Sequence, residues 1–300
     1  MLTVRPDFYD RFTCLASRCR HSCCIGWEID IDEDSQALYA ALPGEIGDKL
    51  RANCRDGHFV LTAGEHCPLL RRDGLCELIL AHGEEALCDI CYEHPRFYNE
   101  LSDRTEEGLG LCCEAVTALL LESGGPLALL TEEDDEPAEP DGAELALLSA
   151  RDACFSLLER SGTLLNGMER AAALHGLSLP RGSVGDWAEE LLSLEQMDGA
   201  WTALLRACLS RRDDPFSTLP EGDGPFLRMA EYFLYRHYVP AGERAGEMLC
   251  LCFLLTALAA AFSGQTGDLG DTLRLLSAEL EYSDENMDIL LNKIRERIEQ

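Results

Sequence analysis

The stretch C-L-A-S-R-C-R-H-S-C-C, from Cys14 to Cys24, decides how the first third of this chain folds, because it places four cysteines in eleven residues. Seven more cysteines follow before residue 114: Cys54, Cys67, Cys76, Cys88, Cys91, Cys112 and Cys113. A chain of 300 residues can bury a core of its own and needs no cross-links to fold. The density of thiols therefore indicates a chemical role.

The charge of the chain narrows the class of ligand. The sequence holds 55 acidic and 25 basic residues, for a formal net charge of -30. Such a charge repels a phosphate backbone, so we expect no nucleic acid ligand. It favours encounters with cationic partners, including proteins that carry surface lysines.

The apolar segments predict a cytoplasmic protein without a transmembrane segment. The N-terminus lacks the apolar run and small residues of a secretory signal. The longest apolar run, residues 249–262, is fourteen residues long, and a bilayer span needs roughly 20. We therefore expect a buried helix there. In the cytoplasm thiols stay reduced, which favours metal binding or redox chemistry over disulfides.

The spacing within the opening stretch separates its last two thiols. Cys19 and Cys23 are four residues apart, so on a helical turn they share a face and can hold one metal centre. Cys24 then points about 100° away. Adjacent cysteines of this kind either serve different centres or include one that only packs.

The later cysteines form pairs typical of metal ligands. Cys67 and Cys76 flank a turn at residues 73–74, and Cys88 and Cys91 form a C-x-x-C knuckle that leads into a proline. Thiolate ligands select zinc or an iron–sulfur cluster over magnesium and calcium. Two regular C-x-x-C pairs, the usual pattern of a zinc ribbon, are missing from the sequence, so both metals remain open on spacing alone.

The overall fold class that we predict is mainly α, with an irregular cysteine-rich metal-binding half that has short strands, followed by an α-helical bundle half. Residues 1–121 form the predicted iron–sulfur or zinc domain. Residues 122–142 form an acidic linker or surface loop, because seven carboxylates and two prolines between Glu132 and Asp141 cannot bury apolar area. Residues 143–300 form the predicted helical domain.

Periodicity and capping residues give the individual elements. In the cysteine-rich half we predict strands at 27–32 and 58–62, a helix at 34–42, and a helix at 76–87 that is interrupted near Gly83. In the second half, the predicted helices cover 143–165, 187–208 with Asp186 as its cap, 226–239, 243–262, 269–280 and 283–298.

Four sequence blocks carry a family resemblance. They are C-L-A-S-R-C-R-H-S-C-C-I-G-W, C-P-L-L-R-R-D-G-L-C, C-Y-E-H-P-R and L-C-C-E-A, and they cover residues 14–115 in this order. Together they resemble the flagellin lysine-N-methylase family, which is related to the broader C-x-x-C-x-x-C-C zinc- and iron-chelating proteins. In the second half, the segment E-Y-F-L-Y-R-H-Y-V is also similar to the family.

The resemblance implies a cytoplasmic enzyme with an oxygen-sensitive iron–sulfur cluster, of the 4Fe-4S type, with zinc as the alternative. It further implies transfer of methyl groups from S-adenosylmethionine to lysine ε-amines of flagellin or another protein. Cys88, Cys113 and Cys54 fall outside the family pattern and are expected to be dispensable. The metal ligands that the resemblance implies are Cys14, Cys19, Cys23, Cys24, Cys67, Cys76, Cys91 and Cys112.

Eight cysteines are too many for one four-iron cluster with four protein ligands. Either there are two metal centres or about half of these thiols do something else, and we expect the division to fall at Cys23-Cys24.

The route of methyl transfer stays open at this point. The sequence contains neither the Rossmann-type methyltransferase loop nor the cysteine triplet of radical enzymes, which would need a cysteine where Gly26 stands. A polar reaction requires the lysine to lose its proton first, and the acidic or imidazole side chains nearest the cysteines in sequence are Glu28, Asp30, Glu93, His94 and Glu114. The alternative function is a non-catalytic zinc- or iron-chelating module whose helical half binds a partner protein.

Overall fold

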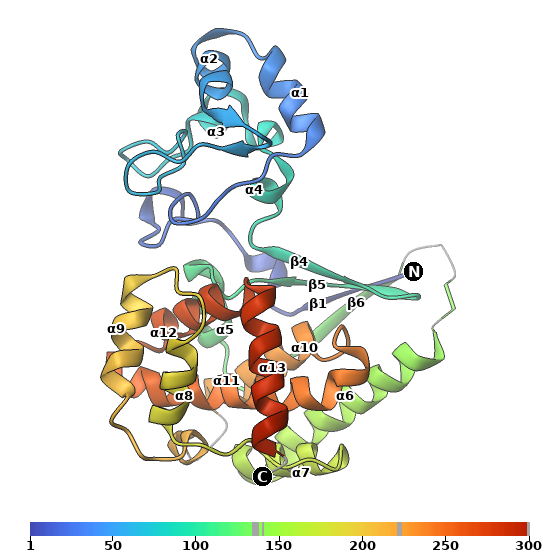
Figure 1. Ribbon diagram of the computed structural model, residues 1–300. Helices are drawn as coiled ribbons and strands as arrows, with labels where there is room; N and C mark the ends of the chain where they lie inside the picture. The colour runs from blue at the N-terminus through green and yellow to red at the C-terminus, as the bar shows by residue number, and fades with distance from the viewer. Residues whose placement is uncertain (134–137, 140, 221–223, 299–300) are drawn as a thin grey trace. The chain divides into compact units, whose positions relative to one another are not determined.

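The computed structural model describes residues 1–133, 138–139, 141–220 and 224–298, and the chain divides into two compact units (Figure 1). The cysteine unit consists of Thr13–Phe97 and Cys113–Ala115. The helical unit consists of Met1–Phe12, Tyr98–Cys112 and the chain from Val116 onward. The predicted fold class, mainly α with an irregular cysteine-rich part, is confirmed.

Short elements surround a small apolar core in the cysteine unit. Its helices are α1 (Glu33–Ala41), α2 (Gly44–Asn53), α3 (Glu77–His82) and α4 (Asp89–Glu93), and its hairpin pairs β2 (Cys54–Arg55) with β3 (His58–Phe59). The core contains buried side chains such as Ile29, Tyr39 and Phe59. Several cysteines, including ones predicted to bind metal, pack against the same core.

The predicted elements of this unit are partly confirmed. Helix 34–42 is present as α1, and the helix from 76 ends at His82, where Gly83 has a φ of 87° that favours glycine. The predicted strand at 27–32 is wrong: the segment makes one isolated bridge, between Asp30 and His58. Its alternation nevertheless matches burial, because Ile29 and Ile31 are buried while Asp30 is exposed.

A four-stranded sheet in the helical unit was not predicted. Figure 1 shows its strands side by side in the order β4-β5-β1-β6, and β1 is parallel to β5 and antiparallel to β6. The strands are β1 (Leu2–Pro6), β4 (Arg96–Glu100), β5 (Arg104–Leu109) and β6 (Leu129–Glu133). The sheet therefore joins the N-terminus to segments about a hundred residues away in sequence.

Buried polar side chains attach this sheet to helices. Tyr235 donates its hydroxyl hydrogen to the carbonyl oxygen of Val4 at 2.7 Å, and Tyr232 does the same to Leu109 at 2.6 Å. Glu106 on β5 accepts two hydrogen bonds, at 2.6 and 2.7 Å, from the guanidinium of Arg151. These contacts replace the backbone partners that short strands lack and hold the sheet in register.

The helices of this unit pack around one apolar helix, α11 (Ala245–Thr266). It contacts α7, α9, α10, α12 and α13. The segment Gly242–Thr266 is long and apolar enough to cross a membrane by length and composition, yet 89% of its most apolar window is buried inside the protein. The other helices are α5 (Glu114–Glu122), α6 (Gly142–Arg160), α7 (Leu164–Leu174), α8 (Val184–Leu192), α9 (Gly199–Cys208), α10 (Pro225–His237), α12 (Leu269–Leu276) and α13 (Asp284–Ile298).

Three predicted helices differ from the structure. The helix predicted at 143–165 ends at Arg160 as α6, and α7 begins at Leu164. The helix predicted at 187–208 is two helices, because Asp198 caps a new start by accepting a hydrogen bond from the amide of Ala200. The first of the two, α8, begins one turn earlier than predicted, with Ser183 and Asp186 forming a capping box. The helix predicted at 269–280 continues after Leu276 as a π-helical turn, Ser277–Glu281.

The boundaries of the two compact units differ from the predicted ranges 1–121, 122–142 and 143–300. The strands β1, β5 and β6 bring residues 1–12 and 98–112 into the helical unit, because sheet pairing connects distant parts of the chain. The predicted linker contains the strand β6, and its residues 134–137 and 140 lie outside the described residues.

Candidate metal centre

Four thiols, which we call the inner thiols, lie together on the core of the cysteine unit. Cys67 is buried, and the other three are half-buried and pack against the same core. The backbone holds three of them in place: the amide of Cys67 donates to the carbonyl oxygen of Cys24 at 2.8 Å, and Leu70 forms a bridge with Cys76. The fourth lies on α4. The inner thiols are Cys24, Cys67, Cys76 and Cys91.

Burial raises the pKa of two of these thiols. The pKa of Cys67 rises to about 12, and the pKa of Cys76 rises as well, because a thiolate inside an apolar core loses its hydration. The nearby backbone amides oppose the rise without cancelling it. A bound metal ion offsets the same cost, because it stabilises the thiolate form.

The inner thiols also act on one another electrostatically. After burial and its backbone donors, the pKa of Cys67 is raised further by Cys24 and Cys76. The pKa of Cys91 is raised first by its hydrogen bond with Cys88, then by burial, and then by Cys88, Cys24 and Cys67. Four thiolates this close repel each other unless a cation lies among them. The residues therefore fit a thiolate-bound metal centre.

Cys88 lies beside the inner thiols but has other contacts. Its pKa is lowered to about 7, first by its hydrogen bond with Cys91, and it also shares a hydrogen bond with Tyr39. The hydroxyl of Tyr39 lies 3.0 Å from the carbonyl oxygen of Ala86. Spacing alone had identified the C-x-x-C knuckle, but only the fold shows that Tyr39 contacts it.

A second set, the outer thiols, consists of Cys14, Cys19, Cys23 and Cys113. The sulfur of Cys14 accepts a hydrogen bond from the amide of Ala16 at 3.4 Å, and Ala16 has a φ of 49°, an uncommon conformation for a residue with a Cβ. The pKa of Cys23 is raised first by its hydrogen bond with Cys24, then by burial, and then by Cys24, Cys14 and Cys113.

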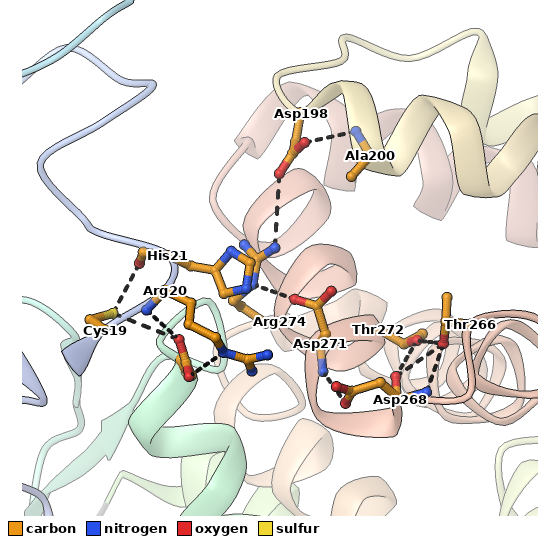
Figure 2. Close-up of polar contacts among 11 residues, drawn as sticks. Cys19, Arg20, His21, Asp198, Ala200, Thr266, Asp268, Asp271, Thr272 and Arg274 are labelled. Carbon is orange, nitrogen blue, oxygen red and sulfur yellow. Dashed lines mark hydrogen bonds and ion pairs between the residues drawn. The ribbon is translucent and has the colours of Figure 1, made fainter.

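The loop that carries Cys19 is fixed to the start of α5. Arg20 donates from its backbone amide and its Nε to Glu114, at 2.9 and 2.8 Å, and the Cys19 sulfur lies 3.9 Å from the same carboxylate (Figure 2). Cys113 immediately precedes Glu114 in the chain. The loop that carries Cys19 therefore meets the residue that follows Cys113.

The fold places the eighth implied ligand, Cys112, in the helical unit. There its thiol shares a hydrogen bond with Tyr282, whose pKa is raised first by burial and also by Cys112. Cys54 is half-buried beside the core of the cysteine unit, and burial raises its pKa to about 11.

One compact group of possible metal ligands contains no cysteine. Across the described ranges, one group of three or more His, Cys, Asp and Glu has all its ligand atoms within 4.8 Å of one another, namely Glu28, Asp30 and His58. No three cysteine sulfurs of these ranges lie that close to one another.

The side chains considered as bases for lysine differ in environment. Glu28 Oε1 lies 3.0 Å from His58 Nδ1, and both Glu28 and Asp30 are exposed. His94 packs on Trp27, and burial lowers its pKa to about 4. A histidine with such a pKa stays neutral near pH 7 and is a weak proton acceptor.

The helical unit contains a buried polar cluster that the sequence did not predict. Glu281, at the end of the π-helical turn, lies 2.5 Å from Nε2 of His237 and 3.3 Å from Nη1 of Arg236. Burial opposes ionisation, but Arg236 and His237 lower the pKa of Glu281 to about 2. Both partners belong to the segment E-Y-F-L-Y-R-H-Y-V, so that segment contributes a buried ion-pair network that joins α10 to the π-helical turn.

Comparison with known proteins supports the family resemblance. The chain is 30% identical over 140 residues to a protein named lysine-N-methylase from Salmonella typhimurium, and 29% identical over 140 residues to one from Salmonella choleraesuis. Each match covers 42% of this chain and 34% of the relative. The chain is also 28% identical over 139 residues to the flagellar biosynthetic protein FliU of Salmonella muenchen, covering 80% of that protein.

The matches thus span about a third of the length of the two lysine-N-methylases. No protein-family model matches the chain, and no solved structure matches it. The suspected relationship to the lysine-N-methylases is confirmed as similarity to these proteins.

Proposed function

We propose that this chain is an iron–sulfur protein that transfers methyl groups from S-adenosylmethionine to lysine ε-amines of a protein, with flagellin as the first candidate. The observation that carries the proposal is the set of four inner thiols packed at one apolar core, in a chain similar to proteins named lysine-N-methylase. The name of the third relative, a flagellar biosynthetic protein, supports a flagellar substrate.

We assign the iron–sulfur cluster to Cys24, Cys67, Cys76 and Cys91. A set made of thiols alone suits an iron–sulfur cluster, with zinc as the alternative. Such a cluster supplies soft Lewis-acid or one-electron chemistry when bound. The protein contributes thiolates and an apolar core that limits access of water and oxygen.

The cysteine unit also offers groups that suit the substrate. Glu28 and Asp30 are exposed carboxylates beside His58, and together they attract the ammonium group of a lysine. His58, held at 3.0 Å by Glu28, has the arrangement of a base oriented by a carboxylate and can accept the proton that the lysine must lose before its nitrogen attacks a methyl group.

A cytoplasmic location accompanies this proposal, because the thiolates and an oxygen-sensitive cluster require reducing surroundings. The alternative is a zinc- or iron-chelating module without catalysis, whose helical unit binds a partner. It predicts bound metal and no transfer of methyl label in the same experiment.

The experiment is anaerobic purification followed by incubation with a reductant, labelled S-adenosylmethionine and flagellin. We expect iron and acid-labile sulfide in the protein and label in lysine residues of flagellin. Iron and sulfide without label transfer would support the module, and zinc without sulfide would overturn the cluster.

A further inference from the structure

We propose that Glu28, Asp30 and His58 form a binding site for one divalent cation, separate from the thiols, and that the bound cation stops His58 from accepting a proton. The site itself does not depend on methyl transfer. Its effect on His58 is a regulation of the reaction and rests on the proposed function.

The backbone brings the three side chains to one face of the β2–β3 hairpin. Asp30 and His58 oppose each other in an antiparallel bridge, so their side chains lie on the same face. The amide of Phe59 donates to the carbonyl oxygen of Ile29 at 3.1 Å and fixes this pairing. Ile29 is buried, and the residues on either side of it, Glu28 and Asp30, are exposed, as expected for alternating side chains.

The ligand atoms of the three side chains are close enough to surround one ion. All three atoms lie within 4.8 Å of one another, and Glu28 Oε1 is 3.0 Å from Nδ1 of His58. Metal–ligand bonds of about 2.1 Å at right angles place neighbouring ligand atoms about 3.0 Å apart and opposite ones about 4.2 Å apart. Small rotations of the side chains therefore bring all three atoms into contact with one cation.

The charges of the site also favour a cation. Two carboxylates converge here in a chain whose formal net charge is -30. Among the residues that the structure describes, neither Glu28 nor Asp30 pairs with a lysine or an arginine, and the partner of Glu28 is His58. Carboxylates this close repel each other unless a positive charge lies beside them. A divalent cation supplies that charge.

The donor atoms select the kind of ion. Carboxylate oxygens suit Mg²⁺, Ca²⁺ and Mn²⁺, whereas imidazole nitrogen suits iron and zinc. A set of two carboxylates and one imidazole therefore fits Mn²⁺ or Fe²⁺, with water at the remaining positions because both carboxylates are exposed. Thiols prefer softer metals, so Mn²⁺ distinguishes this site from the inner thiols.

A bound cation changes the chemistry of the imidazole ring. Because Nδ1 of His58 faces the Glu28 carboxylate, it carries the ring proton, and the lone pair of Nε2 is available. A cation bound at Nδ1 displaces that proton, and the ring stays neutral by taking one from solvent at Nε2. The lone pair that would accept the lysine proton is then occupied. Release of the cation restores it.

The test is a titration of the anaerobically purified, cluster-containing protein with manganese chloride in about 150 mM salt, which screens diffuse attraction. Electron paramagnetic resonance of hydrated Mn²⁺ measures the free ion. We expect one bound Mn²⁺ per chain and an affinity at least about tenfold weaker in Glu28→Gln/Asp30→Asn. The matched control, Glu33→Gln/Asp34→Asn, removes the same charge from two exposed residues nearby and should bind like the unaltered chain.

The imidazole ligand has a measurement of its own. Pulsed electron paramagnetic resonance should detect coupling of bound Mn²⁺ to a ring nitrogen in the unaltered chain and in the control, and no such coupling in His58→Gln. Equal affinities of the two double variants, no nitrogen coupling in the unaltered chain, or no bound Mn²⁺ at millimolar concentration would each overturn the site.

Methyl transfer tests the effect of the ion on His58. Saturating Mn²⁺ should slow transfer of label about a hundred-fold, the typical contribution of a general base, and chelation should restore the rate. An unchanged rate with the site occupied would overturn the blocking of His58. If no label is transferred with or without Mn²⁺, the proposed function fails, whereas one bound Mn²⁺ with nitrogen coupling still establishes the cation site.

Discussion

Replacing Glu231 with glutamine should stabilise the protein at alkaline pH. Glu231 lies on α10 with no exposed surface, and its Oε2 accepts from the amide of Leu127 at 2.6 Å. Its other oxygen, Oε1, has no hydrogen-bond partner among the residues that the structure describes. Burial raises the pKa of this carboxyl group to about 8, although the Leu127 amide opposes the rise.

The sign and size of the effect follow from proton linkage. The reference pKa is 4.5, so between about pH 4.5 and 8 the folded state keeps a proton that the unfolded state has lost. The stability that comes from the protonated carboxyl group is therefore complete below pH 4.5 and is lost as the pH rises to about 8. At 1.36 kcal/mol per pH unit, the loss is on the order of 5 kcal/mol.

The assay is denaturant unfolding of the unaltered chain and of Glu231→Gln at pH 5 and pH 8, with the exposed Glu169→Gln as the matched control. We expect the two chains to be nearly equal at pH 5 and Glu231→Gln to be more stable by several kcal/mol at pH 8. Because each comparison is made at one pH, effects of pH on the thiols cancel. An advantage of Glu231→Gln that is the same at both pH values would refute the reasoning.

Two further substitutions test the ion pair that attaches the sheet to α6 and the proposed base. Arg151→Met should destabilise the protein by about 3–5 kcal/mol in denaturant unfolding, because it leaves the buried carboxylate of Glu106 without its partner. The double variant Glu106→Gln/Arg151→Met should recover most of that loss. An equal loss of stability in the double variant would contradict this explanation. His58→Gln should lower the rate of methyl transfer about a hundred-fold with unchanged iron content, since a general base typically contributes that much; an unchanged rate would exclude His58 as the base.

The helices were predictable because their signals are local. The apolar run at 249–262 has no polar face, and α11 is accordingly the buried centre of the helical unit. Gly83 and Ser283 gave correct helix limits, since the amide of Asn286 hydrogen-bonds to the Ser283 hydroxyl.

The sheet was not predictable from local patterns. Its strands are five or six residues long, and the strand β5 carries Glu106 at a buried position, where a charge argues against a strand in the interior. The guanidinium of Arg151, forty-five residues away in sequence, donates hydrogen bonds to the Glu106 carboxylate and so makes its burial possible. The pairing of Leu2 with Arg104 likewise has no signal within either segment.

The environments of the cysteines were predictable in part. The adjacent pair Cys23-Cys24 predicted two different environments, and Cys24 packs against the apolar core whereas Cys23 is exposed. The contact of Cys19 with Glu114 joins residues that lie 95 positions apart, which no spacing rule reveals.

The central proposal is that the inner thiols hold the cluster on which lysine methylation depends. The most direct test is peptide mapping by mass spectrometry of flagellin after anaerobic incubation with S-adenosylmethionine and either Cys67→Ser or Cys54→Ser. We predict methylated lysines with Cys54→Ser, which keeps its cluster, and none with Cys67→Ser. Equal methylation by both variants, or by neither, would contradict the proposal.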